Sequence, residues 1–207
     1  MSLVVSFTCR RYPAPLPVPA WARTRLNNAQ VDLLIDSARA EDAPALARTI
    51  LAAWLETYPD QDAGISEAWI RAHRGDVVTS EGIAQWQGFI EEVERQPGRR
   101  FCRVVRNGGE IVGLLCGQRA ESVSLGPMYM RQEAQGRGIG RQLMAAFLAW
   151  ADDELISLWV TAYNERAISF YKHYGFEDTG ERHLWRDRLP NIRMTRPAGG
   201  GQRGAKP

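Results

Sequence analysis

The feature that most limits how this chain can fold is a run of three alternating glycines, QGRGIG, from Gln135 to Gly140. It follows a run ending at Met130 that is typical of a β-strand, and it precedes residues 141–155, which show helical periodicity. Glycines in such a turn let the backbone approach a ligand closely, and the free N–H groups of the first helical turn favour an anion, most often phosphate. The run by itself predicts either an anion site or a tight packing turn.

Two common phosphate-binding loops do not match this run. A dinucleotide-binding turn needs the pattern G-x-G-x-x-G, whereas the glycines here are Gly136, Gly138 and Gly140. A Walker loop needs a lysine and then Ser or Thr after its last glycine, whereas Arg141 and Gln142 follow here. Spacing and chemistry therefore disfavour a nucleotide-binding α/β protein.

The rest of the chain predicts one mixed domain. Helical periodicity covers residues 41–57, 66–74, 81–95, 141–155 and 165–173. Strand-like runs cover residues 31–38, 101–106, 110–118, 122–130, 156–161 and 191–195, and another begins at Phe176. This order predicts an α+β, three-layer fold: a mixed, mostly antiparallel central sheet of about six or seven strands with helices on both faces.

Composition sets the domain limits. Residues 1–30 contain PAPLPVP and are expected to be a disordered leader, because alternating prolines deny the backbone a helix or a strand ladder. Residues 197–207 are glycine-rich and are expected to be a disordered tail. The folded domain is therefore expected to span residues 31–196.

Net charge and hydropathy limit which classes of partner and which location are expected. The formal net charge is only +2 and there is no basic groove pattern, so nucleic acid is not an expected partner. No secretory signal or membrane-spanning run is apparent, which makes the cytoplasm the expected location. The cysteines and histidines are widely scattered, so no metal is expected.

A second motif lies about thirty residues after the glycines. NERAISFYKHYGF runs from Asn164 to Phe176 and predicts a short helix capped by Asn164, with Gly175 ending it. Packing explains most of this motif. It explains Tyr171 least well, because a buried phenol needs a polar partner.

Together, QGRGIG and NERAISFYKHYGF resemble the acetyl-CoA-binding core of the GNAT superfamily of N-acetyltransferases. That family's motif is Gln or Arg, two residues, Gly, one residue, and Gly or Ala, and Gln135, Gly138 and Gly140 match it. The resemblance covers residues 33–196. It implies the acyl-CoA N-acyltransferase fold, acetyl-CoA as cosubstrate, and direct attack of a primary amine on the thioester.

The resemblance also implies roles for individual residues. The loop N–H groups would hold the CoA pyrophosphate, with arginines adding contacts, and the backbone of the preceding strand would bind the pantetheine arm. Tyr171 occupies the position of the family's general acid, which protonates the departing thiolate. The expected cosubstrate-binding residues are Met128, Tyr129, Met130, Gln135, Gly136, Arg137, Gly138, Ile139, Gly140, Arg141 and Asn164.

The general base is where the sequence departs from the family. Two positions that carry a glutamate in relatives hold Trp159 and, approximately, Ser124 here. Glu121, Glu133 or a chain of water molecules could remove the proton from the amine instead.

The acceptor is expected to be a small-molecule amine, a free amino acid or a peptide amine, bound by a monomer or homodimer. By analogy with the family, the pocket residues are expected to be Trp54, Tyr58, Trp69, His183 and Trp185. Two other readings stay open: a non-catalytic acyl-CoA-binding or regulatory module of the same fold, and a protein N-terminal or lysine acetyltransferase.

Overall fold

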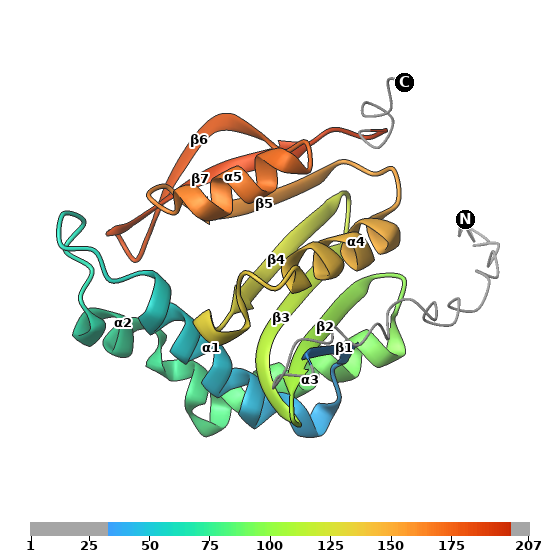
Figure 1. Ribbon diagram of the computed structural model, residues 1–207, viewed down its shortest axis with the longest axis horizontal. Helices are drawn as coiled ribbons and strands as arrows, with labels where there is room; N and C mark the ends of the chain where they lie inside the picture. The colour runs from blue at the N-terminus through green and yellow to red at the C-terminus, as the bar shows by residue number, and fades with distance from the viewer. Residues whose placement is uncertain (1–32, 200–207) are drawn as a thin grey trace, which may run out of the picture.

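A computed structural model describes residues 33–199, and its seven strands form one sheet in the order β1-β2-β3-β4-β5-β7-β6 (Figure 1). The predicted leader and residues 200–207 of the predicted tail lie outside the described residues. The strands are β1 (Leu33–Ser37), β2 (Arg100–Asn107), β3 (Glu110–Arg119), β4 (Val123–Met130), β5 (Ile156–Thr161), β6 (Glu177–Trp185) and β7 (Leu189–Arg196). Only the β4–β5 pair is parallel, so the predicted mixed, mostly antiparallel sheet is confirmed.

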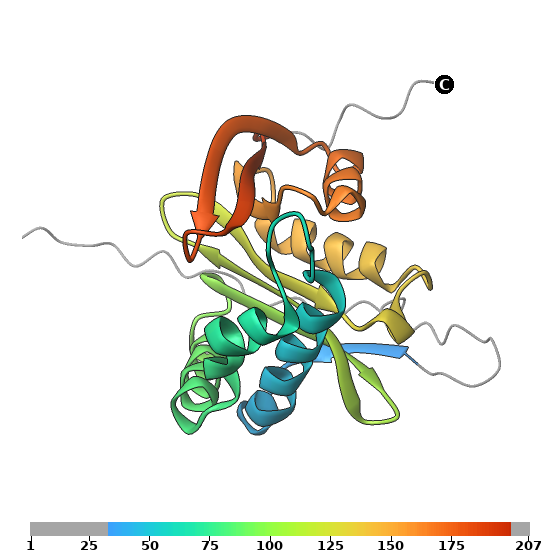
Figure 2. The same ribbon diagram turned by 90° about the vertical axis from the view of Figure 1, so that its left-hand side faces the viewer.

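Within the described residues, five α-helices cover the sheet, and their order along the chain confirms the predicted order of elements. They are α1 (Ala43–Thr57), α2 (Glu67–Arg74), α3 (Ser80–Arg95), α4 (Ile139–Ala151) and α5 (Glu165–His173). Helices α1 to α3 lie on one face, and α4 and α5 lie on the other (Figures 1 and 2). No helix within residues 33–199 combines the length and apolar character that a bilayer crossing requires.

Strand β3 is the centre of the fold, because its side chains from Ile111 to Gly117 are buried on both faces. Such a continuous apolar run is typical of a strand covered by helices on both sides. One apolar core joins the sheet to α4 and α5, and the other joins it to α1, α2 and α3. Helix α4 approaches β3 so closely that a Cβ at Gly117 would lie 2.4 Å from Phe147.

Strands β4 and β5 separate soon after they meet. They pair only at Val123–Ile156 and Ser124–Ser157, whereas β4 stays paired with β3 as far as Met130. The β3–β4 register shifts next to Gly126 and Pro127, and a β-bulge of this kind bends a strand. Beyond Ser124, the edge of β4 that faces β5 therefore has no strand partner among the described residues. The gap between these two strands is where the site lies.

The boundaries of α4 differ from those that periodicity predicts. The helix begins at Ile139 instead of Arg141, with Gly138 in a left-handed conformation at its N-cap. It ends at Ala151 instead of Leu155, because the backbone of Asp152 leaves the helical conformation with a φ of 58°, and the Arg119 guanidinium donates to the carbonyl oxygens of Trp150 and Ala151 at 2.8 and 3.3 Å. A cationic side chain from elsewhere in the chain thus satisfies carbonyl groups that the end of the helix leaves free.

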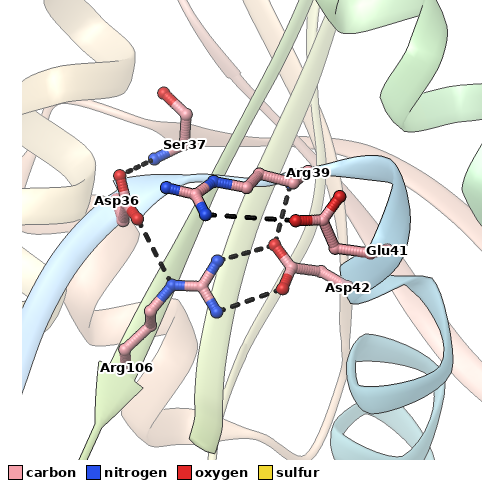
Figure 3. A network of polar contacts seen from close by, with 6 residues as sticks. All are labelled: Asp36, Ser37, Arg39, Glu41, Asp42 and Arg106. Atoms are coloured by element: carbon pink, nitrogen blue, oxygen red, sulfur yellow. Dashed lines mark hydrogen bonds and ion pairs between the residues drawn. The ribbon is translucent and has the colours of Figure 1, made fainter. Parts of the chain in front are cut away.

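A half-buried ion-pair network ties β1 and the start of α1 to β2 (Figure 3). Both terminal nitrogens of Arg106 donate to the Asp42 carboxylate, at 3.1 and 2.6 Å, and its Nε donates to Asp36 at 3.3 Å. The Asp42 carboxylate also accepts from the backbone N–H of Arg39 at 2.8 Å. Burial opposes ionisation of Asp42, but these hydrogen bonds and charges outweigh it and lower the pKa of the carboxyl.

Replacing Asp42 by Asn is expected to lower the free energy of unfolding at pH 7 by about 1–3 kcal/mol, because hydrogen bonds to charged groups contribute on this scale. The pKa of Asp42 is depressed in the folded state, so its contribution is present above the unfolded pKa, near 3.8, and is lost as the pH falls through the folded value. Urea unfolding at pH 7 and pH 3 measures both effects. The matched control is Asp36→Asn, since Asp36 is more exposed and holds Arg106 by a single bond.

Candidate active site

A cavity of about 540 Å³ opens where β4 separates from β5. The side of β4, the glycine loop, the start of α5 and the end of α1 all contribute to its wall. Eleven of the predicted site residues line it: Tyr58, Met128, Tyr129, Met130, Gln135, Gly136, Gly138, Gly140, Arg141, Asn164 and Tyr171. The two sequence motifs therefore meet at one cavity.

The glycine loop presents unpaired donors to this cavity. Gly136 and Gly138 have φ angles of 75° and 77°, which only glycine adopts readily. Within residues 33–199, the N–H groups from Gly136 to Gly140 donate no hydrogen bond to another protein group. Arg141, in the first turn of α4, lines the same wall. Unpaired N–H groups at a helix N-terminus beside a cation form a setting that suits a phosphate.

Gln135 bridges the two sides of the cavity. Its side-chain Nε2 donates to the carbonyl oxygen of Met130, on β4, at 2.8 Å, and its Oε1 accepts from Arg166 on α5. Asn164 caps α5 by accepting from the N–H of Ala167 at 3.1 Å. These contacts fix the end of β4 and the start of α5 relative to the glycine loop.

Tyr171 lies on α5, 7 % exposed, with its ring packed edge-on against Phe176 at 5.8 Å. Its hydroxyl makes no hydrogen bond to another described residue, although the residue lines the cavity. Burial raises the pKa of Tyr171, and the nearby Tyr129 phenol adds to the effect. The group is therefore a neutral phenol with its proton available at the cavity.

Two of the predicted contacts in the glycine loop do not line the cavity with their side chains. Arg137 is exposed and lies outside the lining, whereas Arg141 is part of it. Ile139 is the first residue of α4, and its side chain is 2 % exposed and packs in the core, so only its backbone can face a ligand. Sequence alone does not separate these residues, because the loop conformation decides which side chains point inward.

Neither of the glutamates considered as bases lines the cavity. Glu121 lies in the β3–β4 turn and Glu133 in the 3-10 turn before the glycine loop, and both are exposed. Glu56, at the end of α1, is the one carboxylate in the lining. It accepts from Arg131 Nε at 2.5 Å and from the Gln132 N–H at 2.9 Å, so it is already engaged.

The sequence analysis does not predict the other residues that line the cavity. Ala167 and Phe170 follow Asn164 at helical spacing, so the helical period could have identified them. Glu56 lies in α1 and Gln132 in the 3-10 turn after β4, and only the folded structure brings these two distant segments together. The lining residues not predicted are Ala53, Glu56, Thr57, Gln132, Arg166, Ala167 and Phe170.

Four of the predicted acceptor residues lie outside the lining. Trp54, Trp69 and Trp185 instead form an aromatic cluster: the ring of Trp185 lies 5.0 Å from that of Trp54 and 5.7 Å from that of Trp69. The cluster reaches the cavity through Tyr58, whose ring lies 4.7 Å from Trp54. His183 lies on the exposed strand β6 and packs on Trp159.

Comparisons with known proteins agree with this geometry. Residues 48–176 match the acetyltransferase (GNAT) family. The chain is 35 % identical over 84 residues to the 5-NmdU N-acetyltransferase of Pseudomonas phage PaMx11, a match that covers 39 % of this chain and 60 % of the phage protein. It is 27 % identical over 145 residues to the uncharacterised N-acetyltransferase YjgM of Escherichia coli, covering 66 % of this chain and 77 % of that protein.

A solved structure shows the same fold. The PaiA N-acetyltransferase of Thermoplasma acidophilum, determined in complex with coenzyme A, superposes with a TM-score of 0.66 at 17 % identity, covering 80 % of this chain and 98 % of that one. The family match spans the opening between β4 and β5, the glycine loop and Tyr171. The chain therefore belongs to the acetyltransferase (GNAT) family.

Proposed function

We propose that the protein transfers the acetyl group of acetyl-CoA to a primary amine. The observation that carries this proposal is the meeting of three features at one cavity: the unpaired edge of β4, the unpaired N–H groups of the glycine loop and the protonated phenol of Tyr171. Family membership supports the same reaction.

The residues present fit acetyl-CoA. The loop N–H groups and Arg141 would hold the pyrophosphate, and the free edge of β4 near Met128 to Met130 would hold the pantetheine amides as a neighbouring strand does. When bound, acetyl-CoA supplies a thioester carbon that an amine can attack and a thiolate that leaves. Tyr171 would hold its proton where that thiolate departs.

In this proposal, solvent water removes the proton from the amine, and no side chain acts as the base. The one carboxylate in the lining, Glu56, is engaged by Arg131 and by a backbone N–H. The acceptor would therefore react from its neutral fraction, and kcat/KM should rise with pH up to the pKa of the amine. We further propose that the acceptor is a small-molecule or peptide amine, and that the protein acts in the cytoplasm as a monomer or homodimer.

Two measurements test the proposal. Calorimetry should show binding of acetyl-CoA at micromolar concentration and none of ATP or NAD. Release of free thiol with a panel of primary amines should then show turnover. Binding without turnover would favour the non-catalytic acyl-CoA-binding module, and failure to bind acetyl-CoA would remove the whole proposal.

A further inference from the structure

The last turn of α2 carries an arginine that no described carboxylate neutralises. Arg74 forms no ion pair within residues 33–199, and its Nε is buried without a hydrogen-bond partner. The guanidinium lies over the ring of Trp54, 5.2 Å from its centroid. One turn earlier, Arg71 is exposed and lies 3.7 Å from Glu67. Removing a cation from water without a counter-charge is unfavourable, so Arg74 is a candidate ligand-binding group.

Arg74 lies next to the cavity wall. Trp54, on which it packs, contacts the rings of Tyr58 at 4.7 Å and Tyr129 at 6.3 Å, and both tyrosines line the cavity. Burial raises the pKa of the Tyr129 phenol, and the Arg74 charge partly counteracts this. Arg74 is therefore joined to the cavity wall through the ring of Trp54.

Two more arginines lie at this end of the molecule, where the α1–α2 loop and the β6–β7 turn are side by side (Figures 1 and 2). Arg188 lies 5.9 Å from the ring centroid of Trp69, and Arg186 lies 5.6 Å from that of Trp185. Neither forms an ion pair with a described residue. One exposed carboxylate, Asp187, lies between them in sequence. The aromatic cluster thus carries three arginines on its rings, and Arg74 is the most buried of them.

We propose that the acceptor amine also carries an anionic group, a carboxylate or a phosphate, and that Arg74 binds this group. The inference rests on the proposed acetyl transfer and makes Arg74 a residue that determines acceptor specificity. The fork of an arginine suits planar carboxylates and phosphates, and surrounding aromatic rings strengthen such a contact by excluding water. A neutral acceptor would leave Arg74 without a counter-charge.

Matched acceptor pairs test the proposal. β-Alanine is compared with β-alaninamide, and phosphoethanolamine with ethanolamine, by thiol release at saturating acetyl-CoA. The quantity measured is the ratio of kcat/KM for the anionic acceptor to that for its neutral counterpart. Comparing this ratio between wild type and variants cancels the intrinsic reactivity of each amine. The pair that shows the larger preference tells whether the anion is a carboxylate or a phosphate.

The wild type is expected to favour the anionic member of at least one pair. Arg74→Gln should lower that ratio about 10- to 100-fold, since a hydrogen bond to a charged group is worth about 1.5–3 kcal/mol. Arg74→Lys should keep part of it, because the charge remains. Arg71→Gln is the matched control on the same helix and should leave the ratio unchanged. Thermal unfolding of each variant checks that α2 is intact.

An unchanged ratio in both Arg74 variants would overturn the inference while leaving the acetyltransferase proposal in place. The inference is also overturned if the wild type acetylates the neutral member of each pair with the same kcat/KM as the anionic member. If acetyl-CoA binds but no acceptor of any kind releases thiol, the proposed function fails, and the inference fails with it.

Discussion

Replacing Tyr171 by Phe is expected to lower kcat about 10²- to 10⁴-fold while leaving the affinity for acetyl-CoA unchanged. The phenol is the one neutral acid of the second motif at the cavity, and positioned proton transfer typically contributes this factor. The ring of Phe fills the same space, so the packing against Phe176 is retained. Thiol-release kinetics measure kcat, and calorimetry measures the affinity.

Tyr174 supplies the control for this experiment. It lies one turn further along at the C-cap of α5, is partly buried, and does not line the cavity. Tyr174→Phe should therefore turn over at the wild-type rate. Near-normal turnover by Tyr171→Phe would remove Tyr171 from the mechanism.

The raised pKa of Tyr171 also predicts the shape of the alkaline pH profile. Because burial holds the pKa of this phenol above the ordinary value of 10.0, the acid stays protonated throughout the range in which amines become neutral. The value of kcat/KM should rise with pH up to the pKa of the acceptor amine and show no decline up to about pH 10. A decline with a midpoint near pH 8 would show that another, more acidic group supplies the proton.

Replacing Arg141 by Gln is expected to raise the dissociation constant for acetyl-CoA about 10- to 100-fold. This range corresponds to the loss of one charge-assisted contact, about 1.5–3 kcal/mol. The guanidinium lies in the cavity wall beside the unpaired N–H groups of the glycine loop. The loss should be smaller at high ionic strength, because salt screens the same contact in the wild type. Calorimetry at two salt concentrations measures both effects.

Arg137 provides a comparison of the same residue type in the same loop. Its side chain does not line the cavity, so Arg137→Gln should change the dissociation constant only a few-fold. Equal losses in the two variants would mean that both arginines reach the pyrophosphate, as the sequence by itself suggests. No loss in either variant would refute the assignment of this loop as the phosphate-binding element.

Much of the fold follows from local patterns in the sequence. The turn at Asn107-Gly108-Gly109 predicts the β2–β3 hairpin, and Gly108 and Gly109 both have the positive φ that such a turn needs. The helical period predicts α1 and α3 to within a few residues. The two motifs that predict the cavity, QGRGIG and NERAISFYKHYGF, do line it. These features depend on residues that are close together in the sequence, so they can be predicted from local sequence patterns.

Features that depend on distant contacts could not be predicted in this way. Strand β6 extends to Trp185, although residues 177–184 are exposed and carry no apolar alternation, because pairing with β7 alone holds it. The engagement of Glu56 by Arg131 brings together residues 75 positions apart. The position of Arg74 over Trp54 depends on how α2 packs on α1. The sequence likewise offers Glu121, Glu133 or a chain of water molecules as the base, and only the fold shows that neither glutamate lines the cavity.

The short pairing between β4 and β5 affects how the two halves of the sheet are held relative to each other. Strands β1 to β4 form one half of the sheet and strands β5 to β7 the other, and backbone pairing joins the halves only at Val123–Ile156 and Ser124–Ser157. The β4 backbone proposed to hold the acyl arm belongs to the first half, while Tyr171 follows β5 in the second. The position of Tyr171 relative to the free edge of β4 therefore depends on this short pairing together with the apolar core and the Gln135 contacts that join the halves. Substitutions at these two pairs can therefore shift Tyr171 relative to the β4 edge, although none of the paired residues lines the cavity.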